Sequence, residues 1–204
     1  TLSLTACGGS TDTAKTDQAD GKDTFTVGFD QDFPPFGYVG DDGEFTGFDI
    51  EMATECAARM GKKIVLQPID WDAKDMELEA GTIDCIWNGF TMNGREDQYT
   101  WTDPYMDNSQ VVVVKKDSGI NTLADLAGKV VEVQKESAAE TALNDEEHAD
   151  LMASFAQLLS VGEYNTAFMD LESGAVDAVA IDIGVAQFQI EGKEDQYQIL
   201  DETI

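Results

Sequence analysis

Polar side chains follow two apolar strands that the sequence predicts. The first strand, TIDCIWN at 82–88, ends in Asn88 and runs into Gly89, Phe90 and Thr91, and the second, AVDAVAI at 175–181, runs into Asp182. In open α/β sheets, ligands bind beyond the carboxyl ends of the strands. If the two strand ends face each other, a loop that carries a hydroxyl group lies opposite a single carboxylate. That pairing is the geometry of a binding site for a small polar molecule.

Residues that could support enzyme chemistry are few. The single histidine, His148, lies in DEEHAD, a pattern typical of a solvated helix face. The chain has no G-x-S-x-G, P-loop or G-x-G-x-x-G motif and no His/Cys spacing for a metal, so we expect neither a cofactor nor a metal. An acid/base pair formed by Asp30 and Asp182 stays open as the one catalytic arrangement.

A repeated segment precedes both strand ends. MELEAGTIDC at 76–85 and MDLESGAVDA at 169–178 share five identical positions, and the match extends without gaps from 71–85 to 164–178. Each copy predicts a helix, a glycine at its C-terminal end and a buried strand. Two lobes of like design explain the repeat. The alternative is coincidence in a chain rich in Leu, Glu and Gly.

Strand and helix patterns alternate along the chain, which predicts an α/β fold with mostly parallel strands. Further strands are predicted from about Thr24 and at 64–69, 111–116, 129–134 and from 197. Further helices are predicted at 47–63, with Asp49 as the N-cap, at 71–81, from a capping box at 137–140 onward to about 159, at 164–174 and at 184–192. The alternative for the segment 137–159 is that its acidic middle breaks the helix.

Composition limits the possible partners. The 204 residues have a formal net charge of -29, with 12 Lys+Arg against 41 Asp+Glu. That charge disfavours nucleic acid and an anionic membrane surface as direct partners. No run of about 18 apolar residues is present, so no membrane span is predicted.

The first residues resemble a bacterial lipoprotein box. LTAC at 4–7 would place the lipid on Cys7, and the Gly/Ser/Thr/Asp tract that follows is typical of a flexible tether. The alternative is an N-terminus with an incidental cysteine. The other two cysteines, Cys56 and Cys85, can either pair outside the cytoplasm or remain buried thiols.

The sequence from about residue 24 resembles the extracytoplasmic solute-binding proteins, family 3, of polar amino-acid ABC importers. The matching stretches, in order, are VGFDQDFPPFGY, GFDIEMATECAARMGKK, WDAKDMELEAGTIDCIWNGFT, REDQYTWTDPY, VVVVKKDSGINTLADLAGKVVEVQ and LESGAVDAVAID. The resemblance implies a type II periplasmic-binding-protein-like fold, in which two α/β lobes joined by two hinge strands close over one amino acid.

The resemblance also implies roles for particular residues. Arg95 would bind the α-carboxylate of the ligand, because a guanidinium can contact a carboxylate in bidentate fashion. Thr91 and the backbone around Asn88 and Gly89 would complete the shell around the ligand's charged groups, and Asp182 would bind the α-ammonium. The alternatives are that Arg95 forms a surface ion pair and that Asp182 caps the helix that follows.

Five more residues complete the expected ligand-binding site. Phe33 and Trp71 would form apolar walls, or else belong to the core, and Asp30 would contact the tip of the ligand's side chain. Ser137 and Ala138 begin a helix whose free amides suit a carboxylate, although Ser137 is also a structural cap. Glu136 lies beside them and would repel an anion.

These inferences predict how the chain is organised and what it does. Residues 1–23 would be the lipoprotein remnant and tether, 24–113 lobe 1, 114–196 lobe 2, and 197–204 a second hinge strand, with the C-terminal part of lobe 1 missing. We expect a monomeric lipoprotein, outside the cytoplasm, that captures a polar or cationic amino acid and delivers it to an ABC permease. The alternatives are a dehydratase-like enzyme acting on a cyclic acid and a sensor domain.

Overall fold

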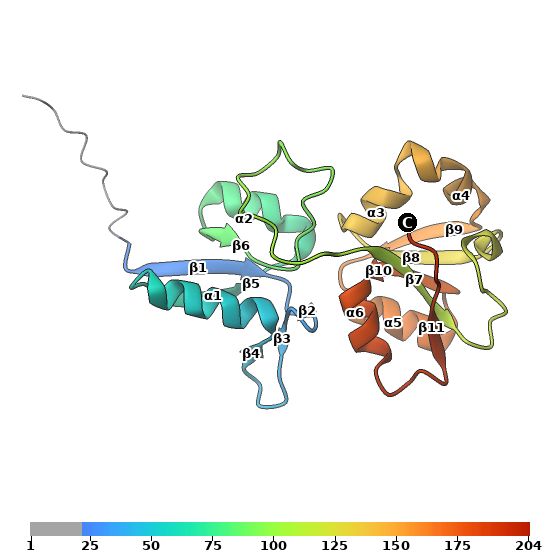
Figure 1. Ribbon diagram of the computed structural model, residues 1–204, viewed down its shortest axis with the longest axis horizontal. Helices are drawn as coiled ribbons and strands as arrows, with labels where there is room; N and C mark the ends of the chain where they lie inside the picture. Colours follow the sequence, from blue (N-terminus) through green and yellow to red (C-terminus); the bar gives the residue numbers. More distant parts are fainter. Residues whose placement is uncertain (1–21) are drawn as a thin grey trace, which may run out of the picture.

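A computed structural model describes residues 22–204. It consists of two α/β bodies side by side, joined by an extended connection (Figure 1). We call the part from Thr24 through the loop that follows the strand Cys85–Ile86, including Arg95, lobe 1, and the part from Gln110 onward lobe 2. Cys7 and the predicted tether up to residue 21 lie outside the described residues. No helix of residues 22–204 combines the length and the apolar composition needed to cross a membrane.

Lobe 1 is built on a parallel sheet in the order β5-β1-β6. Its strands are β1 (Thr24–Phe29), β5 (Lys63–Pro68) and β6 (Cys85–Ile86), and its helices are α1 (Phe48–Arg59), the 3₁₀ turn η1 (Trp71–Ala73) and α2 (Lys74–Ala80). A small antiparallel sheet follows β1, formed by β2 (Asp32–Phe33), β3 (Gly37–Val39) and β4 (Phe45–Thr46).

Lobe 2 is built on a mixed sheet in the order β11-β7-β10-β8-β9. Its strands are β7 (Gln110–Lys115), β8 (Val130–Gln134), β9 (Gln157–Val161), β10 (Ala178–Asp182) and β11 (Tyr197–Ile199). Its helices are α3 (Ala138–Leu143), α4 (Ala149–Ser154), α5 (Tyr164–Ser173) and α6 (Ile183–Ile190), with 3₁₀ turns η2 (Leu123–Leu126) and η3 (Glu146–His148).

The core of lobe 2 lies on both faces of its sheet. In β7, Val111 and Val113 pack in one apolar cluster and Val112 and Val114 in the other. Successive side chains of a strand point to opposite faces, so an uninterrupted apolar run buries both. The predicted buried strand is therefore confirmed. The predicted boundary between the lobes, after residue 113, falls inside β7. The predicted lobe bounds remain a prediction.

The sequence repeat coincides with a structural repeat. In lobe 1 the order β1-α1-β5-α2-β6 folds into a parallel sheet β5-β1-β6, and in lobe 2 the order β8-α3-α4-β9-α5-β10 folds into β9-β8-β10. The repeated segments thus occupy equivalent places, each a helix followed by the strand that pairs with the first strand of its unit.

The two repeated segments, 71–85 and 164–178, share backbone details, and we call them the repeated corners. Gly81 and Gly174 end α2 and α5 with φ values of 71° and 82°, a left-handed conformation that favours glycine. Three residues later, Asp84 Oδ2 accepts a hydrogen bond from Thr26 N at 2.7 Å, and Asp177 Oδ2 accepts one from Val130 N at 2.8 Å. The predicted duplication is confirmed at the level of these contacts.

The expected break in the acidic middle of the segment 137–159 is confirmed, whereas the helical end of that segment and the cap of α1 were predicted wrongly. The pattern from 137 to 159 does not form one helix: it breaks into α3, η3 and α4, and residues 157–161 form β9. The acidic stretch NDEEH supplies no apolar face for a continuous helix. The N-cap of α1 is Gly47 rather than Asp49, whose side chain makes no capping bond.

Candidate functional site

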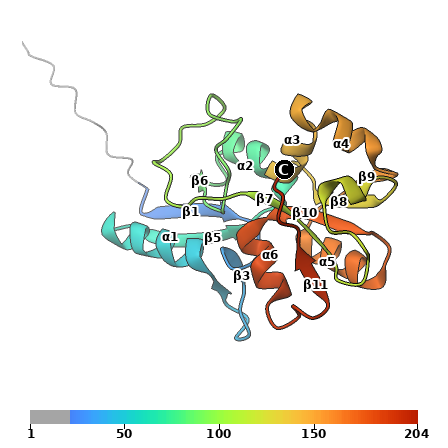
Figure 2. The ribbon, with the colours of Figure 1, turned by 45° about the vertical axis from the view of Figure 1, so that its right-hand side comes forward.

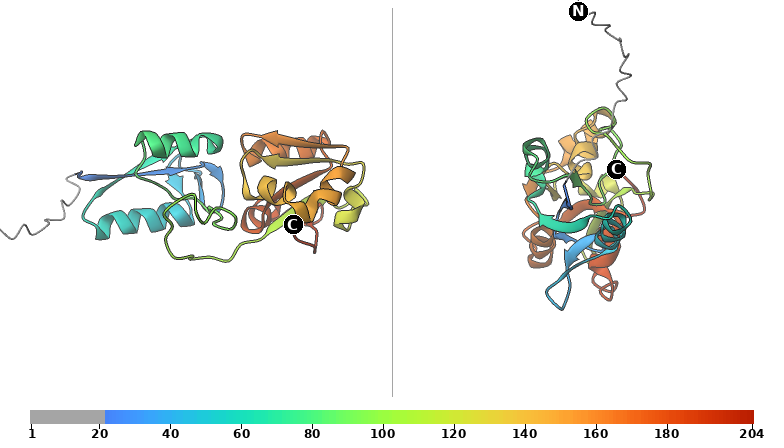
Figure 3. Two further views of the ribbon diagram at one scale, coloured as in Figure 1. Left: turned by 90° about the horizontal axis from the view of Figure 1, so that it is seen from above. Right: turned by 90° about the vertical axis from the view of Figure 1, so that its left-hand side faces the viewer.

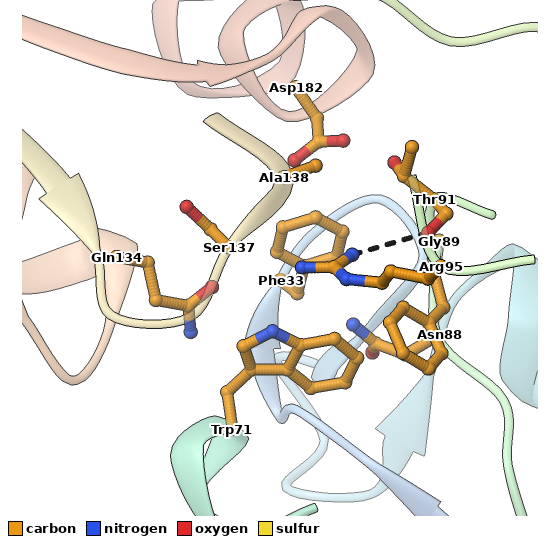
Figure 4. A pocket seen from close by; sticks show the side chains of 11 residues that line it. Phe33, Trp71, Asn88, Gly89, Thr91, Arg95, Gln134, Ser137, Ala138 and Asp182 are labelled. Atoms are coloured by element: carbon orange, nitrogen blue, oxygen red, sulfur yellow. Dashed lines mark hydrogen bonds between the residues drawn. The ribbon is translucent and has the colours of Figure 1, made fainter. Parts of the chain in front are cut away.

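Residues from both lobes converge on a small cavity (Figure 4). Its volume is about 10 Å³, so the lobes lie close together and an amino acid can enter only if they move apart. All the predicted ligand-binding residues except Asp30 line it, together with two others, and the lining is Phe33, Trp71, Asn88, Gly89, Phe90, Thr91, Arg95, Gln134, Ser137, Ala138 and Asp182. Their contact with a ligand stays a proposal.

The loop after β6 is held from behind by hydrogen bonds. Asn88 Oδ1 accepts from Asp30 N at 3.2 Å, and Gly89 N donates to Asp49 Oδ2 at 2.6 Å. A Cβ on Gly89 would lie 3.0 Å from the Phe33 ring, so a side chain there would disturb the wall of the site. The Gly89 amide is therefore already bonded. The carbonyl and the hydroxyl oxygen of Thr91 accept from Arg95 and from Asn108 Nδ2, each at 3.2 Å.

Asp49 is a positioning residue that sequence reasoning took for a helix cap. It is fully buried, and its other oxygen accepts a hydrogen bond from Tyr105 Oη at 2.7 Å. Burial raises the pKa of Asp49, and the bonds from Tyr105 and Gly89 counteract this. An acidic residue in a first helical turn usually indicates a cap, so only the folded chain reveals that it holds the Gly89 loop.

Arg95 provides the positive charge of the site. Its guanidinium lies at the centre of the lining residues, near the aromatic rings and facing Asp182 (Figure 4). The side chain donates to Thr91 O at 3.2 Å and, across the cleft, to Glu136 O at 2.9 Å. The residue is only 8% exposed, which rules out the surface ion pair considered above. Burial lowers the pKa of Arg95, opposed by nearby Tyr99 and Asp182 among others.

Asp182 provides a negative charge from lobe 2. It is 4% exposed, and its Oδ1 accepts hydrogen bonds from Gln110 Nε2 at 2.9 Å and from Asn108 Nδ2. Burial raises the pKa of Asp182, while the two amides and Arg95 act in the opposite direction. Asp182 occupies the N-cap position of α6, but its side chain makes no capping bond. Instead, Asp182 lines the cavity between the lobes (Figure 4).

Asp30 lies just behind the cavity wall, 4% exposed. Its Oδ2 accepts from Gln134 Nε2 at 2.6 Å and its Oδ1 from Asp32 N at 2.8 Å. Burial raises the pKa of Asp30 to about 6, although these bonds counteract it. Gln134 was missed by sequence reasoning, yet it is the last residue of β8. The rule that selected the ends of β6 and β10 would also have selected this position.

Ser137 acts as a structural cap, the alternative considered for it. It precedes α3, and its Oγ accepts a hydrogen bond from Glu140 N at 3.1 Å. The Glu140 carboxylate accepts from Glu136 N at 2.6 Å instead of completing a box with Ser137. Phe90, the other lining residue that sequence reasoning did not assign, lies 5.0 Å from the Trp71 ring and 5.1 Å from the Arg95 guanidinium.

Ion pairs also join the two lobes outside the cavity. Lys74 Nζ lies 2.9 Å from Glu136 Oε2, and Lys135 Nζ lies 2.7 Å from Asp72 Oδ2. A second cavity of about 250 Å³ adjoins the first and shares Arg95 with it. On the far side of the molecule, β3 lies beside α6 (Figure 2), where the rings of Tyr38 and Phe188 are 5.6 Å apart.

Two further points concern metals and thiols. No group of three or more His, Cys, Asp or Glu side chains within residues 22–204 is arranged to hold a metal ion. Cys56 and Cys85 are free thiols, both partly buried. Burial, with smaller contributions from Asp84 and Cys56, raises the pKa of Cys85 to about 12.

Known proteins are similar to this chain in sequence. The L-cystine-binding protein TcyJ of Escherichia coli is 32% identical over 162 residues, covering 78% of this chain and 59% of TcyJ. The arginine-binding extracellular protein ArtP of Bacillus subtilis is 36% identical, covering 66% of this chain and 51% of ArtP. This chain thus spans little more than half the length of these curated relatives.

A solved structure agrees with the fold. The substrate-binding protein of an ABC uptake transporter from Streptococcus pneumoniae, with bound histidine, superposes with a TM-score of 0.82 at 34% identity, covering 87% of this chain and 74% of that one. The family model described as bacterial extracellular solute-binding proteins, family 3, matches residues 25–166. The strand-end cleft, the two α/β lobes and this match show that the chain belongs to that family.

Proposed function

We propose that the protein captures one free amino acid between its lobes and delivers it to the permease of an ABC importer. One observation carries the proposal: a buried guanidinium from lobe 1 and a buried carboxylate from lobe 2 line the same cavity. These are the charges that complement the two ends of a zwitterionic amino acid. The relatives support the proposal, since they are binding proteins for cystine, arginine and histidine.

The α-carboxylate would bind to Arg95. Its guanidinium now donates to two backbone carbonyls, and a carboxylate is the stronger acceptor because the bond is then charge-assisted at both ends. The aromatic rings of Phe90 and Trp71 exclude water on one side. In a site with little water, this charge pair is stronger than it would be at the surface.

The α-ammonium would bind to Asp182. The amides of Asn108 and Gln110 both donate to Oδ1, so Oδ2 is the oxygen that a ligand can take. An ammonium at that oxygen would stabilise the ionised carboxylate and offset the burial that raises its pKa. Thr91 lines the same cavity, and its hydroxyl oxygen, which accepts from Asn108 Nδ2 at 3.2 Å, would accept a further proton of the ammonium.

The ligand's side chain would extend toward Gln134 and Asp30. With the carboxylate on Arg95 and the ammonium on Asp182, the Asp30 carboxylate would have no oppositely charged partner, since its hydrogen bonds come from the neutral donors Gln134 Nε2 and Asp32 N. A cationic side-chain tip would neutralise it, so we propose a polar ligand, and a cationic one in preference to a neutral one. Trp71 would flank the aliphatic part of such a side chain, with a cation–π contact available.

Binding would favour the closed arrangement of the lobes. Arg95 and Asp182 lie in different lobes, so a ligand that contacts both has a higher affinity for the closed state. The bonds from Lys74 to Glu136 and from Lys135 to Asp72 would form as the lobes meet. They are partly exposed at Glu136, Lys135 and Asp72, and such pairs contribute little by themselves.

The cellular setting is part of the proposal. We place the protein outside the cytoplasm as a monomer, held to the membrane by a lipid on Cys7, with the bounds of tether and lobes as given above. The family's members are solute-binding proteins, which supports binding without chemical conversion. The dehydratase-like alternative would be supported by product formed from a prephenate-like acid.

Isothermal titration calorimetry of the full-length protein with arginine, histidine, lysine, glutamine and cystine tests this function. We expect saturable binding of at least one of them with 1:1 stoichiometry, and tighter binding of the cationic members. Absence of binding by all amino acids to a protein that unfolds cooperatively would overturn the proposal.

A further inference from the structure

Glu136 has an unusual backbone conformation directly beside the site. Among residues 22–204, it is the only residue other than glycine with a positive φ, at 57°. A Cβ makes this left-handed region unfavourable, so a residue stays there only where its surroundings hold it. Glu136 precedes Ser137 and Ala138, which line the small cavity. The strained position therefore asks for a reason at the site itself.

Contacts with both lobes hold Glu136 in this conformation. Its backbone N–H donates to Glu140 Oε2 at 2.6 Å, its Oε2 lies 2.9 Å from Lys74 Nζ, and its carbonyl accepts from Arg95 Nη2 at 2.9 Å. The contact with Glu140 is local to lobe 2, whereas the other two partners belong to lobe 1. The side chain and the main chain of Glu136 are thus both bonded across the cleft.

Lys74 is a buried partner for the Glu136 carboxylate. It is only 3% exposed, and lysine is rarely buried to this extent unless it is paired. Its Nζ also lies 5.2 Å from the centre of the Trp71 ring. Seen from above, α2, which begins at Lys74, lies on one side of the molecule, and the chain that connects the lobes runs along the opposite side (Figure 3). The pair is therefore made across the cleft and depends on closure of the lobes.

The Glu136 carbonyl contacts Arg95 from the side away from the small cavity. Arg95 lines both the small cavity and the adjoining one of about 250 Å³, but Glu136 lines only the larger of the two. In the guanidinium, Nη1 donates to Thr91 O of lobe 1 and Nη2 to Glu136 O of lobe 2. A guanidinium has further N–H groups, and these remain for a ligand. One carbonyl from each lobe thus fixes the orientation of the guanidinium.

We propose that Glu136 is a positioning residue for the carboxylate of the ligand. Lys74 holds its side chain, so that its main-chain carbonyl orients Arg95 when the lobes close. The proposal rests on the proposed function. A bidentate contact needs the guanidinium plane to be aligned with the carboxylate, so an Arg95 held by lobe 1 alone binds the ligand less tightly. The carboxylate site is then complete only in the closed arrangement, which links affinity to closure.

A double-mutant cycle measured by calorimetric titration tests this role. The probe is whichever of arginine, histidine, lysine, glutamine and cystine binds the unmodified protein tightest. Lys74→Met keeps the unbranched stem without the ammonium, and Glu136→Gln keeps the backbone without the charge. We expect each to raise Kd about tenfold, and the two together no more than either alone, because they remove one bond. In an Arg95→Ala background, Lys74→Met should change Kd by less than about twofold, because the group that it helps to orient is gone.

Lys135→Met is the matched control. Lys135 precedes Glu136 in the chain and also forms an ion pair across the cleft, but its partner is Asp72. Because this pair is exposed, its loss should change Kd by about twofold or less, with and without Arg95. An effect as large as that of Lys74→Met would show that any ion pair between the lobes acts in the same way, and would overturn the role of Glu136.

Other outcomes also decide against the proposal. Equal losses from Lys74→Met with and without Arg95 would mean that the pair only stabilises closure. Tighter binding by Glu136→Gln would mean that its carboxylate merely repels the ligand, and an unchanged Kd in both single variants would remove the role altogether. If Lys74→Met does not unfold cooperatively in urea, Glu136→Gln in the same two backgrounds decides. If the unmodified protein binds no amino acid, the proposed function fails first, and this proposal with it.

Discussion

The two repeated corners have the same architecture and opposite chemistry. In lobe 1 the corner leads through the two-residue β6 into an irregular loop, whose Gly89 amide is tied to Asp49. In lobe 2 it leads through the five-residue β10 directly to Asp182, which two amides hold. The part that both corners share, a helix, a glycine and a strand, sets the position of the residues that follow the strand. Under the proposed function, the residues that follow each strand would decide which end of the amino acid each lobe binds.

The two lobes also differ in which residues hold the segment that follows the strand. Asp49, which holds the lobe 1 loop, comes from α1 of the same lobe, whereas Asn108 and Gln110 come from the chain that enters lobe 2. The carboxylate of Asp182 is thus oriented by the connection between the lobes. Movement of that connection can change the orientation of Asp182, and it can also reach the Gly89 loop, because Tyr105 in the same connection donates to Asp49.

Removing the positive charge of lobe 1 should have the largest effect. Arg95→Ala deletes one partner of a buried charge pair with the ligand, and such losses are about 3 kcal/mol or more, which is at least about 100-fold in Kd. Calorimetric titration of the best ligand measures it. Arg59→Ala, in the exposed pair with Glu55, is the matched control and should leave Kd unchanged. Equal affinity of Arg95→Ala and the unmodified protein would contradict the assignment of the carboxylate site.

Neutralising lobe 2 should have a somewhat smaller effect. Asp182→Asn keeps the shape of the side chain but removes its charge, and we expect Kd to rise about 30-fold, or about 2 kcal/mol. Because burial raises the pKa of Asp182, the folded state already disfavours the ionised form, so urea unfolding should show little loss of stability. A stability loss as large as the affinity loss would mean that Asp182 is structural.

The charge of Asp30 should make binding of a cationic ligand depend on pH. Its pKa of about 6 in the folded protein means that most molecules carry a neutral Asp30 at pH 5. Arginine affinity should then fall about tenfold from pH 7 to pH 5, while glutamine affinity changes little. Asp30→Asn should abolish the difference. A similar pH dependence for both ligands would place Asp30 outside the side-chain contact.

The same shift predicts a change in stability of the opposite sign. The folded pKa of Asp30 lies above the ordinary value of 3.8, so between about pH 4 and 6 the folded state binds more protons than the unfolded state. The free energy of unfolding should therefore decrease as pH rises through this range. Urea denaturation at several pH values, compared with Asp30→Asn, isolates this contribution, and a pH dependence unaffected by the substitution would contradict it.

The smallest expected effect tests whether the corners are equivalent. Gly81→Ala and Gly174→Ala place a Cβ in open space, where the nearest atom is Lys115 Nζ at 4.0 Å from the second, so the loss comes from the positive φ alone. Each should lower the free energy of unfolding by about 1 kcal/mol. Gly162→Ala, also in open space but without a positive φ, is the control. Clearly unequal losses would show that the two corners support their lobes differently.

The sequence alone determined the elements and most of the site. Apolar periodicity, the glycine helix ends and the repeat specify where strands end, and in an open α/β sheet the strand ends are where ligands bind. Asn88, Gly89, Thr91 and Asp182 followed from that rule, and Arg95 from the family resemblance. These signals are local or depend on a short repeat, so they can be detected in the sequence without knowledge of the fold.

Only the tertiary structure decided which partner each polar group takes. Asp49 is adjacent to a helix start in the sequence, but 40 residues separate it from the amide it binds. Gln134 and Asp30 meet across the cleft, 104 residues apart. Such pairings arise because a buried polar group must find a hydrogen-bond partner wherever packing places one. Local sequence propensity does not specify which distant residue becomes the partner. The orientation of the polar side chains in the site therefore had to come from the folded chain.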